Sequence, residues 1–363
     1  MGLDIKSNHV LDNDLRYIHD NLSIFEKNKL SNKNILITGC CGFLGYYLVN
    51  YLVKYKNELN ISKVIGLDNL FYKKDKLFDF QKNEFEFIKV DIINDDISKI
   101  FEKHTIDFAI HAASIASPTF YRKFPIQTFD VNVIGLRKIL DLLKDKEPEG
   151  ILFFSTSEIY GDPTPNNIPT SEEYNGNVSS LGPRACYDES KRFGETICWV
   201  YNQEYKLPIR IVRPFNNYGP GLSIGDKRLP ADLALSIINN KDIILYSDGS
   251  PTRTYCYIAD AIVGYIKAMV HNKFEVFNIG IDKPELSVLD FAKIFIKKGK
   301  KIFGYDKQLL FKQSSDLSYL EDNPNRRCPN IIKAKTELTY DPSIDPNEGV
   351  ERYLTHLKLN GNK

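Results

Sequence analysis

Residues 34–45 read NILITGCCGFLG, an apolar run followed directly by a glycine-rich turn. Gly39, Gly42 and Gly45 stand between a predicted strand and a predicted helix over Phe43–Tyr55, the setting that a dinucleotide-binding loop requires. The first glycine permits the tight turn, the second lets backbone approach a pyrophosphate, and the third lets helix and strand pack closely. The free N–H groups at the helix start would face the phosphates. A plain strand–helix turn is the alternative interpretation.

Beyond this stretch, predicted strands and helices alternate along the chain. The predicted strands are Asn34–Thr38, Lys63–Leu67, Phe85–Val90, Phe108–His111, Gly150–Ser155 and Ile209–Val212, and further helices are predicted over Gln127–Leu143 and Arg184–Tyr205. This rhythm predicts an α/β fold, a Rossmann-type doubly wound parallel sheet. After about residue 215 turn residues cluster and the strands become short, as at Ile243–Tyr246 and Val276–Ile279. We therefore expect a smaller C-terminal α/β lobe whose loops line a cleft.

The chain is expected to divide into three parts. Residues 1–31 stand apart, because apolar residues recur at helical spacing between Asp12 and Leu30 and predict an amphipathic helix. We expect this helix to pack on the main body, and an arm that binds a partner or a second copy is the alternative. Residues 32–215 would form the dinucleotide-binding domain with the reactive side chains. Residues 216–363 would form mainly a substrate-binding lobe, with some segments returning to the sheet.

The charge balance argues against a nucleic-acid-binding protein. Lys and Arg number 48 and Asp and Glu 47, for a net charge of +1, whereas phosphate-backbone affinity needs clustered cations. The polar start, Met1–Asp14, lacks the apolar core of a secretory signal, and no apolar run has the roughly 18 residues of a membrane span. The six cysteines show no metal-ligand spacing, so we predict no metal site and expect free thiols in the cytoplasm.

Two acidic residues extend the dinucleotide interpretation. Asp68 follows the second strand, where a carboxylate would accept hydrogen bonds from the adenosine ribose. It would also repel a 2′-phosphate, so NAD is favoured over NADP. Asp91 ends the third strand and could accept a hydrogen bond from the adenine amino group, or alternatively cap a helix over 95–101.

Tyr187 and Lys191 are four residues apart within a predicted helix, which places them on one face. A neighbouring ammonium lowers the pKa of a phenol, and a phenolate can take a proton from a sugar hydroxyl as hydride leaves to nicotinamide. Thr156 and Glu158 follow the fifth strand, at the edge where parallel sheets place their ligands. Thr156 could hydrogen-bond the reacting hydroxyl, and Glu158 is a candidate second acid or base; strand-end hydrogen bonding and a helix cap are the alternative.

Together these residues resemble the extended short-chain dehydrogenase/reductase family over roughly residues 33–350. The resemblance rests on TGCCGFLG at Thr38–Gly45, HAAS at His111–Ser114, STSE at Ser155–Glu158 and YDESK at Tyr187–Lys191. It implies a Rossmann fold and NAD. The cofactor contacts that it implies are Gly39, Gly42, Phe43, Leu44, Gly45, Asp68, Asp91, Ile92, Ala112, Tyr187 and Lys191. The helix pair 127–143 and 184–205 resembles a four-helix dimer interface, so a homodimer is expected.

A narrower resemblance is to the UDP-glucuronate decarboxylases. It rests on LGPRACYDESKR at Leu181–Arg192, SEIYGDP at Ser157–Pro163, and DNPNRRCPNI at Asp322–Ile331. It implies that Arg327 reaches the active site and that the substrate, a nucleotide-diphosphate sugar, contacts Ser117, Tyr121, Asn216, Arg228, Tyr246 and Arg253. The sequence departs from that subfamily at Ile115, Thr119 and Phe120, where proline, proline and asparagine are usual, and at Ser179-Ser180.

The reaction implied is loss of CO2 through a transient 4-keto sugar. Tyr187 would take the proton of the 4-hydroxyl as NAD takes the C4 hydride, and Arg327 or Glu158 would assist proton delivery at C5 after CO2 leaves. A nucleotide-sugar 4,6-dehydratase is the second interpretation, although its usual Asp-Glu pair is Ser157-Glu158 here. A 4-epimerase is the third. A non-catalytic, NAD-binding redox sensor is the alternative of a different class.

Overall fold

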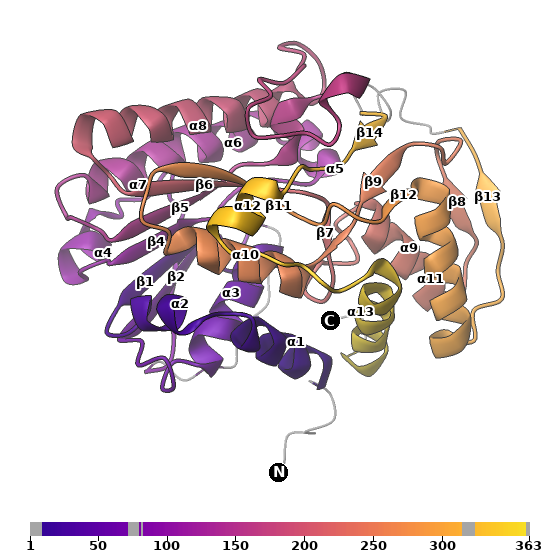
Figure 1. Ribbon diagram of the computed structural model, residues 1–363, viewed down its shortest axis with the longest axis horizontal. Coiled ribbons are helices and arrows are strands. Elements are labelled where there is room, and N and C mark those ends of the chain that lie inside the picture. The colour runs from indigo at the N-terminus through magenta and orange to yellow at the C-terminus, as the bar shows by residue number, and fades with distance from the viewer. Residues whose placement is uncertain (1–8, 72–79, 81–82, 314–323, 361–363) are drawn as a thin grey trace.

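A seven-stranded parallel sheet forms the centre of the computed structural model, which describes residues 9–71, 80, 83–313 and 324–360 (Figure 1). The strands follow the order β11-β6-β5-β4-β1-β2-β3. Their bounds are β1 (Asn34–Thr38), β2 (Lys63–Asp68), β3 (Glu86–Lys89), β4 (Phe108–His111), β5 (Gly150–Phe154), β6 (Ile209–Pro214) and β11 (Glu275–Ile279). The strand order reverses direction between β1 and β4, and open sheets of this kind bind ligands at that point. The predicted α/β class and Rossmann-type sheet are confirmed.

Helices cover both faces of the sheet. On one face lie α3 (Phe43–Lys54) and α10 (Ile258–Met269); on the other lie α4 (Ser98–Lys103), α6 (Pro125–Asp130), α7 (Leu136–Leu143) and α8 (Ala185–Tyr205) (Figure 1). Strand β1 shows why two layers form. Ile35 and Ile37 pack on the α3 side and Leu36 on the α8 side, because alternate side chains of a strand point to opposite faces.

The helix predicted over Gln127–Leu143 contains an irregular turn. A π-helical segment, Val131–Gly135, joins α6 to α7. Asn132, in that segment, is buried and donates to the Ser190 hydroxyl on α8 at 2.9 Å. The wider turn therefore lies where this helical stretch contacts the helix of Tyr187 and Lys191.

A second lobe follows β6 and lies to one side of the sheet (Figure 1). Its elements are β7 (Asn217–Tyr218), α9 (Leu229–Ile238), β8 (Ile243–Leu245), β9 (Thr252–Thr254), β10 (Cys256–Tyr257), β12 (Glu285–Ser287), α11 (Val288–Phe303), β13 (Leu309–Phe311), β14 (Arg326–Arg327) and α13 (Pro346–Asn360). Strand β11 between them joins the main sheet beside β6, and α12 (Ile332–Glu337) packs on it. Strands β12, β9 and β14 form a small sheet of their own, which presents Arg253 and Arg327 side by side.

The N-terminal extension forms two helices where one was predicted over Asp12–Leu30. Helix α1 (His9–Asp20) ends before Ser23, and α2 (Ile24–Lys29) begins there. The break arises because Ser23 and Glu26 form a reciprocal capping box, which starts a new helix. Phe25, part of the predicted apolar stripe, is consequently 49% exposed.

Helix α1 packs against α3, α10 and α13. Residues 1–8 lie outside the described residues. Among the helices of the described ranges, none has both the length and the apolar character that crossing a membrane requires.

Candidate functional site

A cleft of about 920 Å³ opens at the carboxyl edge of the main sheet and extends under the second lobe. That volume lies within the range of small-molecule sites. Every site residue predicted from the sequence lines it: Gly39, Gly42, Phe43, Leu44, Gly45, Asp68, Asp91, Ile92, Ala112, Ser117, Tyr121, Thr156, Glu158, Tyr187, Lys191, Asn216, Arg228, Tyr246, Arg253 and Arg327. The fold thus brings together residues that are up to almost three hundred positions apart in the chain.

The glycine-rich loop is shaped for close backbone packing. Gly39 has φ +68°, and a Cβ there would lie 2.6 Å from the backbone of Ala113. A Cβ at Gly45 would lie 2.7 Å from the Cα of Cys40, so the first turn of α3 can rest on the loop only without a side chain. Gly42 is the N-cap of α3 and has no side chain to cap the helix. The first N–H groups of α3 therefore remain available to an anion, which fits the pyrophosphate of a dinucleotide.

Asp68 and Asp91 line the cleft beside this loop. Both also accept hydrogen bonds from backbone N–H groups. Asp68 accepts hydrogen bonds from the Cys41 N–H at 2.9 Å and the Leu70 N–H at 2.7 Å. Asp91 accepts one from the Ile93 N–H at 2.9 Å, and hydrogen bonds hold its pKa below the usual range against the opposing effect of burial. The alternative in which Asp91 caps a helix over 95–101 is wrong, because α4 begins at Ser98 and its N-cap is Ile97.

Tyr187 and Lys191 lie on the buried face of α8, one turn apart. The Lys191 Nζ donates to the Phe154 carbonyl at 2.7 Å, at the end of β5, and burial lowers the pKa of Lys191 to about 7. Burial raises the pKa of Tyr187, while a hydrogen bond with Thr156 opposes that rise. Burial thus outweighs the other influences on the Tyr187 pKa, and the lowering by Lys191 stays a prediction. The ammonium is engaged by a carbonyl, and burial dominates the phenol.

Thr156 follows β5 and has two hydrogen-bonding roles. Its hydroxyl accepts from the Glu158 N–H at 3.2 Å and so caps the short 3-10 helix Ser157–Tyr160. The same side chain hydrogen-bonds Tyr187. Thr156 therefore caps the short helix, as the alternative interpretation expected. It also contacts the Tyr187 side chain.

Glu158 is held between two arginines. Arg327 donates to it through two nitrogens, at 2.6 and 2.5 Å, and Arg184 donates to its Oε2. Burial raises the pKa of Glu158, but the positive charges of Arg184 and Arg327 outweigh this effect and hold the pKa at about 2. In this arrangement Glu158 is a carboxylate that has no proton to give.

Arg184 and Asp188 are site residues that the sequence analysis did not single out. Arg184 lines the cleft, and its side chain forms an ion pair with Asp188 at 3.4 Å. Burial and the Glu158 charge raise the pKa of Asp188 to about 7. The signal that could have found them is the motif itself: Arg184 lies three residues before Tyr187, and Asp188 directly after it.

Arg327 is positioned by backbone pairing rather than by its loop alone. Strand β14 pairs with β9, so that Arg327 stands opposite Arg253. The Thr170 N–H donates to the Cys328 carbonyl at 2.8 Å and fixes the chain just after Arg327. The preceding residues Asp322 and Asn323 lie outside the described residues.

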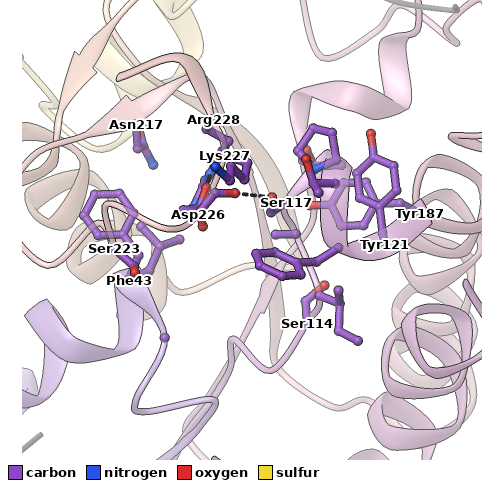
Figure 2. Close-up of a pocket in the computed structure, with 18 of the residues that line it drawn as sticks. Phe43, Ser114, Ser117, Tyr121, Tyr187, Asn217, Ser223, Asp226, Lys227 and Arg228 are labelled. Atoms are coloured by element: carbon purple, nitrogen blue, oxygen red, sulfur yellow. Dashed lines mark hydrogen bonds and ion pairs between the residues drawn. The ribbon is translucent and has the colours of Figure 1, made fainter. Parts of the chain in front are cut away.

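Tyr121 and Ser117 also line the cleft, Tyr121 beside Tyr187 and Ser117 beside Asp226 (Figure 2). The ring of Tyr121 stacks on that of Tyr187, with centroids 5.0 Å apart and planes at 7°. The buried Tyr121 hydroxyl has no hydrogen-bond partner among the described residues, which leaves it available to a ligand. Ser117 donates to the Asp226 carbonyl at 2.5 Å and so links the loop after β4 to the second lobe.

The remaining predicted contacts lie on the second lobe's side of the cleft. Arg228 forms an ion pair with Asp226, and its guanidinium lies 5.9 Å from the Phe43 ring centroid (Figure 2). Arg253 is buried and donates to the Pro324 carbonyl at 2.5 Å. Asn216 has φ +44° and donates to the Thr254 carbonyl at 2.9 Å, and Tyr246 is 38% exposed at the rim.

Comparison with known proteins places the chain among nucleotide-sugar enzymes. The model of the NAD dependent epimerase/dehydratase family matches residues 35–280. UDP-glucuronic acid decarboxylase 1 of Xenopus tropicalis is 33% identical over 90% of this chain and 72% of its own length. UDP-glucuronic acid decarboxylase 6 of Arabidopsis thaliana is 34% identical over 88% and 87%.

Solved structures agree. UDP-glucuronic acid 4-epimerase from Bacillus cereus, in complex with UDP-glucuronic acid and NAD, has a TM-score of 0.73 at 27% identity, covering 90% of this chain and 99% of that one. UDP-glucose 4-epimerase from Thermotoga maritima, with UDP-glucose, has a TM-score of 0.78 at 26% identity, covering 89% and 98%. The resemblance stated from the sequence motifs is confirmed: this chain belongs to the NAD dependent epimerase/dehydratase family.

Proposed function

We propose that this protein is a lyase that decarboxylates a UDP-hexuronate of the UDP-glucuronate type, using NAD. The observation that carries the proposal is the charge around Tyr187. Two buried guanidinium groups, of Arg184 and Arg327, bind the carboxylate of Glu158, whereas the pKa of Asp188 beside Arg184 is about 7, so that only Glu158 is fully ionised at neutral pH. This end of the cleft is therefore positive, which suits a sugar that carries a carboxylate. The identity to UDP-glucuronic acid decarboxylases supports the same substrate.

The residues for NAD are those of the loop after β1 and the ends of the next strands. The N–H groups of Phe43 and Leu44 would bind the pyrophosphate, and Asp68 would accept hydrogen bonds from the adenosine ribose. Asp91, with Ile92 beside it, would bind the adenine, and Ala112 would line the pocket. When bound, NAD supplies the acceptor and later the donor of the hydride.

Tyr187 would act as the base for the sugar 4-hydroxyl. Because Tyr187 and Thr156 hydrogen-bond each other, both hydroxyl groups would be able to reach the same substrate oxygen. Oxidation at C4 makes the sugar a β-keto acid, from which CO2 leaves as negative charge moves onto the 4-oxygen. Tyr187 and Thr156 would stabilise that charge by hydrogen bonding. Lys191 holds the Tyr187 side of the cleft through its bond to the Phe154 carbonyl.

The proton that replaces CO2 at C5 needs a donor. Glu158 is ionised while both arginines bind it. We therefore assign delivery of this proton to a water oriented by Arg327 and Glu158, which refines the sequence hypothesis of direct delivery by either residue.

Substrate contacts are assigned by position. The free hydroxyl of Tyr121, with Ser117 beside it, would bind the sugar, and Asn216 would lie between the sugar and the nicotinamide. Arg228, Tyr246 and Arg253 would hold the nucleotide diphosphate or its base, because a guanidinium donates paired hydrogen bonds to phosphate oxygens.

A 4-epimerase is the second candidate, favoured by the UDP-glucuronic acid 4-epimerase structure. It shares the oxidation at C4 and would keep the carboxylate. A 4,6-dehydratase would instead lose water. Mass spectrometry of products from a panel of nucleotide sugars incubated with NAD separates the three: loss of about 44 mass units is CO2, loss of about 18 is water, and no mass change with a new isomer is epimerisation. We expect the first with UDP-glucuronate, and its absence would refute the proposal.

Two variants on α8 test the alternative of a non-catalytic redox sensor. Tyr187→Phe removes the proposed base, whereas Tyr201→Phe on the same helix removes a hydroxyl that donates to Asp141. We expect Tyr187→Phe to lower turnover by about 10²–10⁴-fold and Tyr201→Phe to leave it unchanged. Equal turnover in wild type and Tyr187→Phe would contradict a catalytic Tyr187.

We also propose a cytoplasmic homodimer. Helices α6 and α8 lie side by side at the surface (Figure 1) and expose large apolar side chains: Ile126, Phe129, Phe193, Trp199 and Val200. Such a patch would be covered if the same two helices of a second copy packed against it. Six cysteines without disulfides suit a reducing compartment.

A further inference from the structure

Two adjacent cysteines and an aspartate meet inside the phosphate loop. Cys40 and Cys41 are both buried, and their Sγ atoms lie 3.9 Å apart. A carboxylate oxygen of Asp68, at the end of β2, lies near both sulfurs. These three atoms are all within 4.8 Å of one another. Adjacent cysteines show no metal-ligand spacing in the sequence, and the third group becomes visible only when β1 and β2 pair.

The distance between the sulfurs fits a tetrahedral metal ion. Two thiolates bound to Zn²⁺ at about 2.3 Å each, at the tetrahedral angle, stand about 3.8 Å apart. The observed 3.9 Å needs almost no rearrangement of the two side chains. Gly66 of β2 leaves room for the Cys40 side chain, because a Cβ there would lie 2.7 Å from the Cys40 sulfur.

The cluster is connected to the cleft. Cys41 and Asp68 both line it, whereas Cys40 is behind them. The Cys41 N–H also donates to Asp68 at 2.9 Å, which holds the carboxylate toward the cysteines. An ion entering from the cleft would meet Asp68 and Cys41 first, and a water from the cleft could complete its coordination.

We propose that Cys40, Cys41 and Asp68 form a binding site for one thiophilic divalent cation, Zn²⁺ or Cd²⁺, and that this cation excludes the dinucleotide. The exclusion rests on the proposed function, in which the same Asp68 carboxylate binds the adenosine ribose. A cation on Asp68 would occupy the oxygens that the ribose needs and would place positive charge and a water under the loop.

Binding displaces protons in a defined number. Each thiol loses its proton as its sulfur bonds to the cation, so two protons leave for each cation bound. Because protons leave as the cation binds, affinity for the cation is expected to increase as pH rises. The Asp68 carboxylate enters without releasing a proton.

Cadmium titration of the full chain, free of NAD, tests the site. Thiolate-to-cadmium charge transfer gives an ultraviolet band, and we expect it to saturate at one cation per chain with release of two protons. Cys40→Ser and Cys41→Ser should each lower affinity by at least about tenfold, as should Asp68→Asn. Cys186→Ser, which changes a cysteine outside the cluster, should leave the titration unchanged. A band that persists in Cys40→Ser and Cys41→Ser, or no band in the wild type, would overturn the proposal.

A second measurement avoids dependence on the variants' folding. Alkylation of Cys41 in the wild type, followed by mass spectrometry of its peptide, should be slowed by Cd²⁺ and equally by Zn²⁺, whereas alkylation of Cys186 should not. Unchanged alkylation of Cys41 would count against the site.

Competition with NAD separates this proposal from the proposed function. We expect NAD to lower the apparent affinity for Cd²⁺ in proportion to its concentration. Cadmium binding that involves the cysteines but is indifferent to NAD would overturn the exclusion. Decarboxylation by metal-free enzyme is measured separately, and its absence would refute the proposed function while leaving the cadmium titration intact.

Discussion

Glu158 shows how single residues set the chemistry of the cleft. Two arginines bind its carboxylate, and they keep it ionised despite burial. The sequence marks Glu158 as a candidate acid. In the fold it is instead a carboxylate that binds two arginine side chains. Sequence reasoning found Thr156, Glu158, Tyr187, Lys191 and Arg327 from their motifs. It could not assign the protonation of Glu158, because Arg184 and Arg327 reach it only through the packing of distant segments.

Arg327 can be compared with its own neighbour. Arg327→Gln removes a guanidinium beside Glu158, and we expect turnover of UDP-glucuronate to fall by about 100-fold while NAD affinity is unchanged. Arg326, the other residue of β14, is exposed and forms an ion pair with Glu285 of β12; Arg326→Gln should leave turnover within about twofold. Steady-state kinetics and NAD titration of the two variants check this. Similar turnover in both variants would contradict the role of Arg327.

His111 makes the stability of the protein depend on pH. Burial, aided by the charge of Lys191, lowers its pKa from 6.5 to about 3. Between these values the unfolded chain binds a proton that the folded chain does not. The free energy of unfolding therefore decreases as pH falls from 6.5 toward 3, by up to about 1.4 kcal/mol per pH unit.

Denaturant unfolding at several pH values in that window tests the effect of His111. His111→Gln, which cannot take up this proton, should show a shallower loss of stability on acidification than the wild type. His9→Gln, at an exposed position, should keep the wild-type slope. A His111→Gln slope equal to that of the wild type would show that His111 does not carry this dependence.

At the scale of elements, α1 is fixed to the body by one buried carboxylate. Asp14 is fully buried and accepts from the Tyr47 hydroxyl at 2.9 Å, the Tyr257 hydroxyl at 2.6 Å and the Arg352 guanidinium at 2.7 Å. Since α3, β10 and α13 supply these donors, one side chain connects the extension to three other elements.

Asp14→Ala leaves these donors without their acceptor, and we expect it to lower the free energy of unfolding by about 3 kcal/mol. Asp12→Ala on the same helix loses only an exposed pair with Lys54 and should cost less than about 0.5 kcal/mol. Chemical denaturation of both variants measures the difference. Equal effects would mean that α1 contributes little through Asp14.

The elements also show the limits of sequence prediction. The strand over Asn34–Thr38 was predicted with its bounds, because an apolar run ending in glycine is a local signal. The break between α1 and α2 was missed, because apolar residues keep their helical spacing across it. A single capping residue, Ser23, is what starts the second helix. The π-helical turn at Val131–Gly135 has no local signal, since it depends on packing against α8.

At the scale of the whole molecule, the exposed patch on α6 and α8 predicts a dimer. Trp199, 55% exposed, lies in it. Trp199→Asp would place a charge in the apolar contact and should shift the protein to a monomer at micromolar concentration. Ile332→Asp, at an apolar residue 64% exposed on α12, should not. Light scattering decides, and a monomeric wild type would contradict the dimer.

The cleft also depends on the whole chain, because strands that are distant in the sequence bring its residues together. The family resemblance assigned Arg253 and Arg327 to the site, and the fold brings them together, since β9 and β14 pair and both arginines line the cleft. The cluster of Cys40, Cys41 and Asp68 depends in the same way on two strands meeting.

The central claim is that this cleft removes CO2 from a UDP-hexuronate by way of a transient ketone at C4. UDP-glucuronate labelled with heavy carbon in its carboxyl group and with deuterium at C4 tests it in one incubation with NAD. We predict one labelled CO2 for each UDP-pentose formed, with the deuterium back on C4 of the product. Labelled carboxyl retained in the nucleotide sugar, or deuterium lost to water, would contradict the account.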